Sequence, residues 1–154
     1  MTSVLPSILF LILSSGLNAQ EWHNIVPLKT TRTEVENLLG RTQTEYFAVY
    51  KLPEGEIFIE YSSGPCRPDR RGGWNVAENV VVSLHFYPKV KRRLADLKLD
   101  RKKLRKVINR HVGGVIYYIN DQDGVVYEIQ DGKVESVEYG PGKRYDHLHC
   151  GDPV

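Results

Sequence analysis

The spacing of hydrophobic residues predicts a short helix near the start of the chain. Val35, Leu38 and Leu39 recur at the three- and four-residue intervals of one helical face. Thr31 precedes them with Glu34 three residues later, which is the spacing of a capping box. Gly40, just beyond this apolar stripe, is a typical stop signal. We therefore expect a helix over residues 31–39.

The same pattern recurs in the second half of the chain. Asp100 takes the cap position, and Leu104, Val107 and Ile108 repeat the apolar stripe before Gly113. These residues predict a second short helix over residues 101–111. Short helices with one apolar face are not stable alone, so both must lie on another layer.

Six segments rich in aromatic and β-branched residues predict that this layer is a β-sheet. They cover residues 46–52, 56–61, 80–87, 115–119, 125–129 and 133–139. Asp131-Gly132 between the last two predicts a tight hairpin. Because strand residues alternate between faces, Tyr117 and Tyr118 must point to opposite sides of the sheet.

The chain also resembles itself, since residues 28–60 can be laid over residues 97–129 without a gap. This constant offset predicts a duplicated unit, each copy reading helix, strand, strand, strand. The predicted fold is an α+β domain in which two tandem units form one antiparallel sheet covered by short helices. We place the repeats at about 25–90 and 94–142, with an insert at 62–79 in the first.

The first twenty residues have the order of a secretory signal peptide. An apolar run from Val4 to Leu13 is followed at once by small and polar residues, and it is shorter than the roughly 20 residues of a transmembrane helix. We expect the chain to be exported, periplasmic or secreted, without a transmembrane anchor after cleavage. Residues 21–154 then form a single domain.

Two cysteines, Cys66 and Cys150, lie outside the repeated block. In an exported protein two cysteines usually pair, because oxidising compartments retain disulfides. The alternatives are a reactive thiol at Cys150, or a metal site formed by Cys150 with His147 and His149. We favour the disulfide and expect no metal.

Charge is balanced overall but uneven along the chain. The sequence has 21 basic and 19 acidic side chains, a balance that does not favour a nucleic-acid binder. The segment from Lys89 to Lys106, here called the basic run, holds ten Lys or Arg and two Asp, which leaves 11 basic and 17 acidic side chains elsewhere. The basic run is either an ordinary solvated surface or a binder of anionic lipid headgroups or wall polymers. Its candidate patch comprises Lys91, Arg92, Arg93, Lys102, Lys103 and Lys106.

The segment Ile25-Val-Pro-Leu-Lys-Thr-Thr-Arg-Thr-Glu-Val-Glu-Asn-Leu-Leu-Gly resembles the first helix of small exported bacterial domains of the SmpA/OmlA type. The tandem arrangement is similar to the β-lactamase-inhibitor-protein fold. The chain also resembles uncharacterised secreted bacterial proteins that have a Cys and a Trp in the same loop. These resemblances imply a helical layer over an antiparallel sheet and a role as a binder or scaffold. The lipidated Cys of the SmpA/OmlA lipoproteins is lacking here.

The insert is the first candidate site. Arg67, Arg70 and Arg71 stand near Trp74, and an aromatic residue surrounded by Arg matches the composition of binding hot spots. Such a site suits an anionic or carboxylate-bearing partner. The alternative is a solvated loop stapled by Cys66, with Trp74 tucked over the sheet edge.

We hypothesise a non-enzymatic binding or scaffold module that acts without a cofactor. Its partner would be another envelope or extracellular protein, contacted through an aromatic sheet face and the Cys66/Trp74 insert. The alternative functions are a small exported enzyme or an anionic-surface binder that uses the basic run. The enzyme would use a histidine base with a carboxylate, from among His85, His111, His147 and His149. The chain has no recognised catalytic motif.

Overall fold

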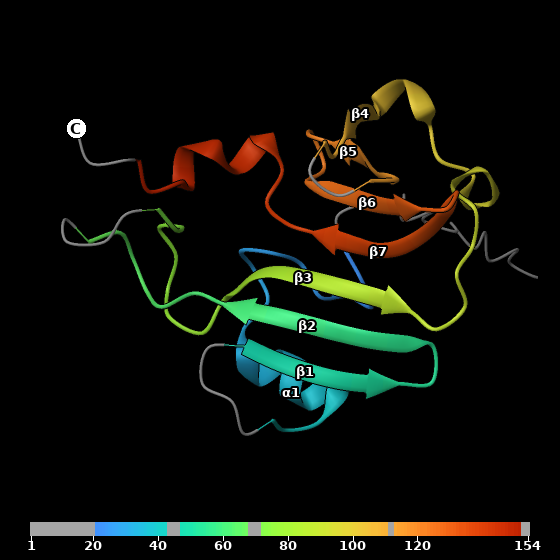
Figure 1. The fold of residues 1–154 in the computed structure, drawn as a ribbon. Helices are drawn as coiled ribbons and strands as arrows, with labels where there is room; N and C mark the ends of the chain where they lie inside the picture. Colours follow the sequence, from blue (N-terminus) through green and yellow to red (C-terminus); the bar gives the residue numbers. More distant parts are fainter. Residues whose placement is uncertain (1–20, 43–46, 68–71, 111–112, 152–154) are drawn as a thin grey trace, which may run out of the picture.

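The computed structural model describes residues 21–42, 47–67, 72–110 and 113–151. These residues form one seven-stranded antiparallel sheet with one short α-helix and three 3-10 helices (Figure 1). The predicted leader, residues 1–20, lies outside the described residues. In chain order the elements are α1 (Arg32–Leu39), β1 (Phe47–Leu52), β2 (Gly55–Tyr61), β3 (Val81–Pro88), η1 (Leu94–Leu97), η2 (Arg101–Lys103), β4 (Arg105–Ile108), β5 (Val115–Asn120), β6 (Val125–Gln130), β7 (Lys133–Tyr139) and η3 (Lys143–Leu148).

The strands lie in the order β1-β2-β3-β7-β6-β5-β4, and every neighbouring pair is antiparallel. Each half contributes three consecutive strands, β1–β3 and β5–β7, and the last strand of each half pairs in the middle of the sheet. All six predicted strands are confirmed, with ends that differ by at most one residue. The antiparallel sheet was therefore predicted correctly.

Helix α1 begins at the predicted cap. The backbone N–H of Thr31 donates to Glu34 Oε2 at 2.7 Å, and the Glu34 N–H donates back to Thr31 Oγ1 at 3.4 Å. The helix ends at Leu39, and its C-cap is Gly40. The φ of Gly40 is 95°, a backbone conformation that glycine adopts without the steric strain of other residues. Val35 is fully buried, whereas Leu38 is 54 % exposed, so the buried stripe is narrower than predicted.

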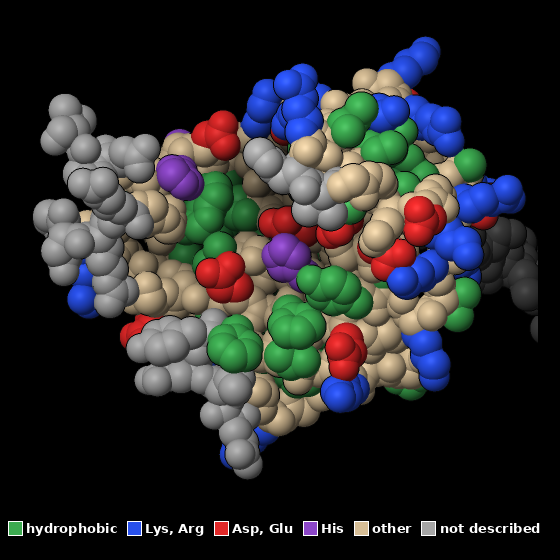
Figure 2. Space-filling view, in the orientation of Figure 1, with side chains coloured by type: hydrophobic (Ala, Val, Ile, Leu, Met, Phe, Trp, Pro, Cys, Tyr) green, Lys and Arg blue, Asp and Glu red, His purple; other side chains and the backbone are tan. Residues whose placement is uncertain are grey.

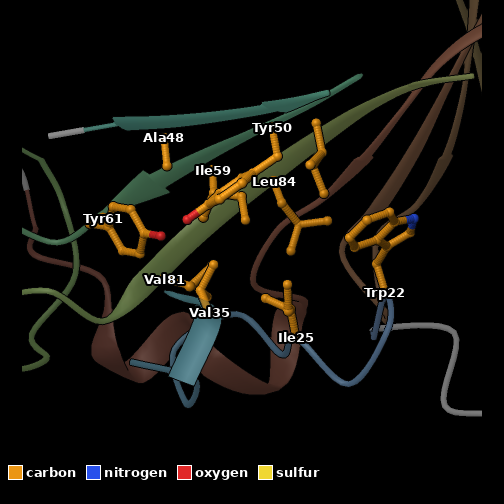
Figure 3. Close-up of a cluster of buried hydrophobic side chains, with 10 residues drawn as sticks. Trp22, Ile25, Val35, Ala48, Tyr50, Ile59, Tyr61, Val81 and Leu84 are labelled. Atoms are coloured by element: carbon orange, nitrogen blue, oxygen red, sulfur yellow. The ribbon is translucent and has the colours of Figure 1, made fainter. Parts of the chain in front are cut away.

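The first core lies between α1 and strands β1–β3 (Figure 3). It also includes Trp22 and Ile25 from the chain that precedes the helix. Tyr50 and Tyr61 point their hydroxyl groups toward each other at one end of this core (Figure 3). The remaining buried members of the core are Val35, Ala48, Ile57, Ile59, Val81 and Leu84.

The second predicted helix, over residues 101–111, is wrong. Asp100 does act as a cap, since its side chain accepts a hydrogen bond from the Lys102 N–H at 3.1 Å. The helix it starts is only η2, however, and Arg105–Ile108 then pairs with β5 as the edge strand β4. The backbone groups on the free edge of β5 need partners, and β4 supplies them. Residues 111–112 lie outside the described residues.

The domain is consequently mostly β, and the α+β description with helices over both halves needs correction. In the second half, the irregular segment between β3 and β4 takes the place of a helix, and its leucine side chains pack against a second core. That core contains Leu94 with residues of β6 and β7, and Leu97, Leu99 and Leu104 pack against it. Because the helix is missing from the second half, the duplication itself stays a prediction.

We predict that Thr31→Ala lowers the free energy of unfolding by about 1 kcal/mol, because it removes one side of the capping box. The Thr31 backbone N–H and, second, its hydroxyl donate to Glu34 and hold the pKa of this carboxyl below its usual value. The variant keeps the backbone bond, so it removes only the hydroxyl's share of this stabilisation, which is present at neutral pH and is lost as the pH falls through the folded pKa. Denaturant unfolding at neutral and acidic pH measures both effects. Thr33→Ala, exposed on the same helix, is the control. Equal losses for the two variants would contradict the prediction.

Candidate functional site

The insert leaves the sheet after β2 and returns before β3 with its two ends joined. The Ser62 N–H donates to Val80 O at 2.7 Å, and the Asn79 N–H donates to Ser62 O at 2.9 Å. The hydroxyl oxygen of the buried Ser62 also accepts a hydrogen bond from the Gly64 N–H at 3.1 Å. The base of the insert is therefore fixed by the backbone of the sheet.

A disulfide between Cys66 and Cys150 ties the insert to the C-terminal tail, with the two Cα atoms 5.5 Å apart. Backbone bonds reinforce the link, from the Cys150 N–H to Gly73 O at 3.0 Å and from the Asn75 N–H to Leu148 O at 2.7 Å. The predicted pairing is confirmed. It leaves Cys150 without the free thiol that a nucleophile or a thiolate metal ligand requires.

Trp74 lies where the insert meets the tail. It forms a β-bridge with His149, and the two rings meet edge to face with centroids 5.1 Å apart. The half-buried Trp74 and the exposed Arg67 line one small hollow of about 110 Å³. The structure thus brings these two predicted site residues together, whereas Arg70 and Arg71 lie outside the described residues.

A larger hollow of about 400 Å³ lies between the insert and the middle of the sheet (Figure 2). Trp74 forms part of its wall, and Glu60, Glu138 and Asp121 supply carboxylates. Asp121 is neutralised by Arg105, whose guanidinium donates to both carboxylate oxygens at 2.9 and 3.0 Å and holds the pKa of Asp121 below its usual value. Glu60 and Glu138 are left as the acidic groups of the hollow.

The sheet has two unlike faces. Strand alternation places the core residues on the face that carries α1, and Figure 2 looks onto the other one. On this second side, here called the open face, Phe58 and Tyr87 meet edge to face with ring centroids 5.6 Å apart, and both are more than a third exposed. Side chains on this face in the second half include Val126, Ile119 and Tyr117. Tyr117 and Tyr118 therefore point oppositely, as predicted.

Carboxylates lie among these apolar side chains near the centre of the open face (Figure 2). Glu138 lies opposite His85 across the β3–β7 pair, with Oε1 3.7 Å from His85 Nε2. Glu60 and Glu128 accept hydrogen bonds from the hydroxyls of Ser83 and Ser136 at 3.0 and 3.1 Å. Lys and Arg side chains instead gather toward the periphery (Figure 2). The open face is thus apolar and acidic.

The histidines considered as bases are dispersed. His85 lies on the open face, His147 and His149 lie in the tail, and His111 lies outside the described residues. No described histidine lines the small hollow, the larger hollow or the cavity described below. The part of the chain that the structure describes also contains no group of three His, Cys, Asp or Glu placed to hold a metal ion.

The residues of the basic run come from several elements, and some of them are paired. Lys91 pairs with Glu135, and Arg93 pairs with Asp96 at 3.4 Å. Lys102 and Lys103 are exposed on η2, and Lys106 lies on β4 opposite Tyr118. The predicted patch is therefore divided among a linker, a 3-10 helix and an edge strand.

A third hollow, here called the seam cavity, lies on the core face between the two cores. Its volume is about 480 Å³, and its lining is largely apolar. Arg92 lines it together with Lys89, another member of the basic run. The apolar and aromatic lining residues are Trp22, Pro53, Phe86, Pro88, Val90, Leu97, Leu99, Tyr127, Val134, Val137 and Tyr139.

Two phenols of the seam cavity are held in their neutral form. Burial, together with the proximity of Tyr127, raises the pKa of Tyr139 to about 12. Burial also raises the pKa of Tyr127. The tyrosines therefore contribute aromatic surface and no charge at neutral pH. The charged groups of the cavity are Glu54, Lys89 and Arg92.

Sequence reasoning missed the seam cavity. Its walls come from the chain before α1, the β1–β2 turn, the linker after β3, and strands β6 and β7. The sequence of each segment, taken alone, is typical of a core strand or of a connecting loop and gives no sign of a cavity. The one available signal was the recurrence of leucine at positions 94, 97 and 99, just before the predicted second helix.

Comparison of the chain with protein families, with curated proteins and with solved structures finds no match. None of the described helices is long and apolar enough to cross a membrane. Disulfides persist in oxidising compartments, so the Cys66–Cys150 bond agrees with an extracytoplasmic setting.

We predict that the unreduced protein, denatured and titrated with a thiol reagent, shows no free thiol, because its two cysteines are bonded. Closure of a loop with a sequence separation of 84 is expected to stabilise the fold by about 4.5 kcal/mol in the chain-entropy model. Denaturant unfolding of a Cys66→Ser, Cys150→Ser variant measures this difference. Two titratable thiols in the unreduced protein, or unchanged stability of the variant, would contradict the prediction.

Proposed function

We propose that this protein is an exported, non-enzymatic binding module that holds a protein partner on the open face beside the Cys66/Trp74 insert. The observation that carries the proposal is the uncovered side of the sheet. Phe58 and Tyr87 are 39 % and 44 % exposed there, and aromatic residues are enriched in protein interfaces. An aromatic surface of this kind loses unfavourable contact with water when a partner covers it.

The charges of the open face indicate the chemistry of the partner. Glu60, Glu128 and Glu138 lie among the apolar residues, whereas the cations Lys51 and Arg105 are paired with Glu56 and Asp121. We therefore expect a partner segment with Lys or Arg next to apolar side chains, which complements this surface. This polarity is the reverse of the anionic partner that the insert arginines suggest.

The insert supports the proposal because it stands at the edge of the same surface. Trp74 lines the larger hollow together with Glu60 and Glu138, and the disulfide holds this loop before any partner arrives. A preorganised loop loses less conformational entropy on binding than a free one. Loops carried by a rigid sheet are common sites of recognition.

The duplication belongs to the same proposal. The hydroxyl-to-carboxylate bond from Ser83 on β3 to Glu60 on β2 has a counterpart from Ser136 on β7 to Glu128 on β6. We infer that β1–β3 and β5–β7 descend from one unit and together form the binding surface. The enzyme and the anionic-surface binder are less well supported, since the histidines are dispersed and the basic run is divided.

The central test places a photo-crosslinking benzoylphenylalanine at Phe58, on the open face. We expect light-dependent adducts with a protein from the native host's envelope, because Phe58 is exposed where the partner lies. The matched control carries the crosslinker at Leu38, which is also exposed but lies on α1, behind the sheet. Equal adducts at both positions, or a partner segment that is acidic and polar, would argue against the open face.

With the partner in hand, Trp74→Ala is predicted to weaken binding by about 2 kcal/mol if Trp74 is a hot spot. Neutralising Lys102, Lys103 and Lys106 should change mainly the salt dependence, because these cations do not line the larger hollow. Titration calorimetry at two salt concentrations separates the two effects. The opposite ranking, or turnover of a substrate that is lost on mutating a histidine, would overturn this assignment.

A further inference from the structure

The seam cavity lies on the opposite side of the sheet from the open face and plays no part in the function proposed above. Its volume of about 480 Å³ falls within the roughly 300–1,000 Å³ that is typical of small-molecule sites. Its composition also matches such sites, which combine apolar and aromatic walls with a few polar groups. Trp22, Phe86 and Tyr139 supply aromatic surface, and Leu97, Leu99 and Val137 supply aliphatic surface.

Backbone hydrogen bonds fix the positions of Lys89 and Arg92, the two cations of the cavity. The Lys89 N–H donates to Glu54 O in the β1–β2 turn at 2.8 Å, and Arg92 O accepts a hydrogen bond from the Val134 N–H of β7 at 2.8 Å. The linker from Lys89 to Arg92 is thus attached at both ends beside the cavity. Val90, in the middle of this linker, is 72 % exposed.

These two cations differ from their neighbours in the basic run. Lys91 and Arg93 have carboxylate partners, Glu135 and Asp96. Lys89 and Arg92 form no ion pair with a carboxylate among the described residues. The carboxylate of the cavity, Glu54, lies 3.6 Å from His23 Nε2 instead. The lining therefore holds two cations without a carboxylate partner and one carboxylate, Glu54, so its net charge is positive.

We propose that the seam cavity binds a free fatty acid, with the alkyl chain between the two cores and the carboxylate at Lys89 and Arg92. The apolar lining favours a hydrocarbon chain, because each methylene group that leaves water for this lining adds to the affinity. A carboxylate at the rim meets two cations and replaces some of its lost hydration by charge-assisted hydrogen bonds. The neutral phenols of Tyr127 and Tyr139 add no negative charge that would repel it.

The experiment titrates the purified protein with dodecanoate below its critical micelle concentration, using calorimetry and tryptophan fluorescence. Trp22 lines the seam cavity and Trp74 does not, so a Trp74→Phe variant makes Trp22 the reporter. We expect saturable binding of one dodecanoate per chain with a change in Trp22 emission. Dodecyltrimethylammonium, which has the same tail and a cationic head, should bind at least about tenfold more weakly, a difference that calorimetry resolves.

Matched variants test the head-group site. Lys89→Glu with Arg92→Glu should weaken dodecanoate binding by about tenfold or more. The control, Lys102→Glu with Lys103→Glu, changes the same charge at exposed positions that do not line the cavity and should leave the affinity unchanged. Both pairs lie on exposed segments, so folding is expected to survive. Leu97→Trp, which fills the cavity from one wall, should abolish binding.

Three outcomes would overturn the proposal. They are the absence of saturable dodecanoate binding, equal binding of the cationic amphiphile, and equal effects of the two charge-reversal pairs. Tighter binding of lysophosphatidylglycerol than of any alkanoate would also contradict the proposal, because it would identify the ligand as a phospholipid and not a free fatty acid. Since the Phe58 crosslinking test concerns the other face, the two proposals can fail independently.

Discussion

The pairing of β3 with β7 is the contact on which the rest of the structure depends. Leu84, His85 and Phe86 lie opposite Tyr139, Glu138 and Val137, and this short ladder joins the two halves into one sheet. Leu84 belongs to the first core and Val137 to the second, so the ladder also aligns the two cores. Without it, each half would be a three- or four-stranded sheet with an exposed inner edge, which invites pairing with other chains.

The same ladder creates both larger hollows. On the core face, α1 covers one half and the leucine-rich linker covers the other, and the space between these covers is the seam cavity. On the open face, the chain leaving β7 continues into the tail, and the disulfide brings the insert against it. Glu138, at the centre of the ladder, thereby becomes part of the hollow beside Trp74.

The two faces also separate the charges of the molecule. The cations that follow β3 lie on the linker, and Lys89 and Arg92 line the core-face cavity. Carboxylates of β2, β6 and β7 project from the other face, where serine hydroxyls and His85 contact them. A nearly neutral chain therefore offers an acidic, aromatic surface on one side and a cationic, apolar cavity on the other. These surfaces suit different ligands, and each is supported by its own set of contacts.

The sequence by itself determined the strands, the capped helix α1 and the pairing of the cysteines. These features rest on local physics, namely two-residue alternation and a Thr31–Glu34 box, and on the tendency of two lone thiols to pair in a chain expected to be exported. It did not determine the fate of residues 101–108, because the same apolar spacing serves a helix or a loop followed by a strand. Only the tertiary structure decided this, since the free edge of β5 needed hydrogen-bond partners. It also decided where Glu138 and Arg92 lie relative to the hollows, because the walls of each hollow come from segments far apart in the chain.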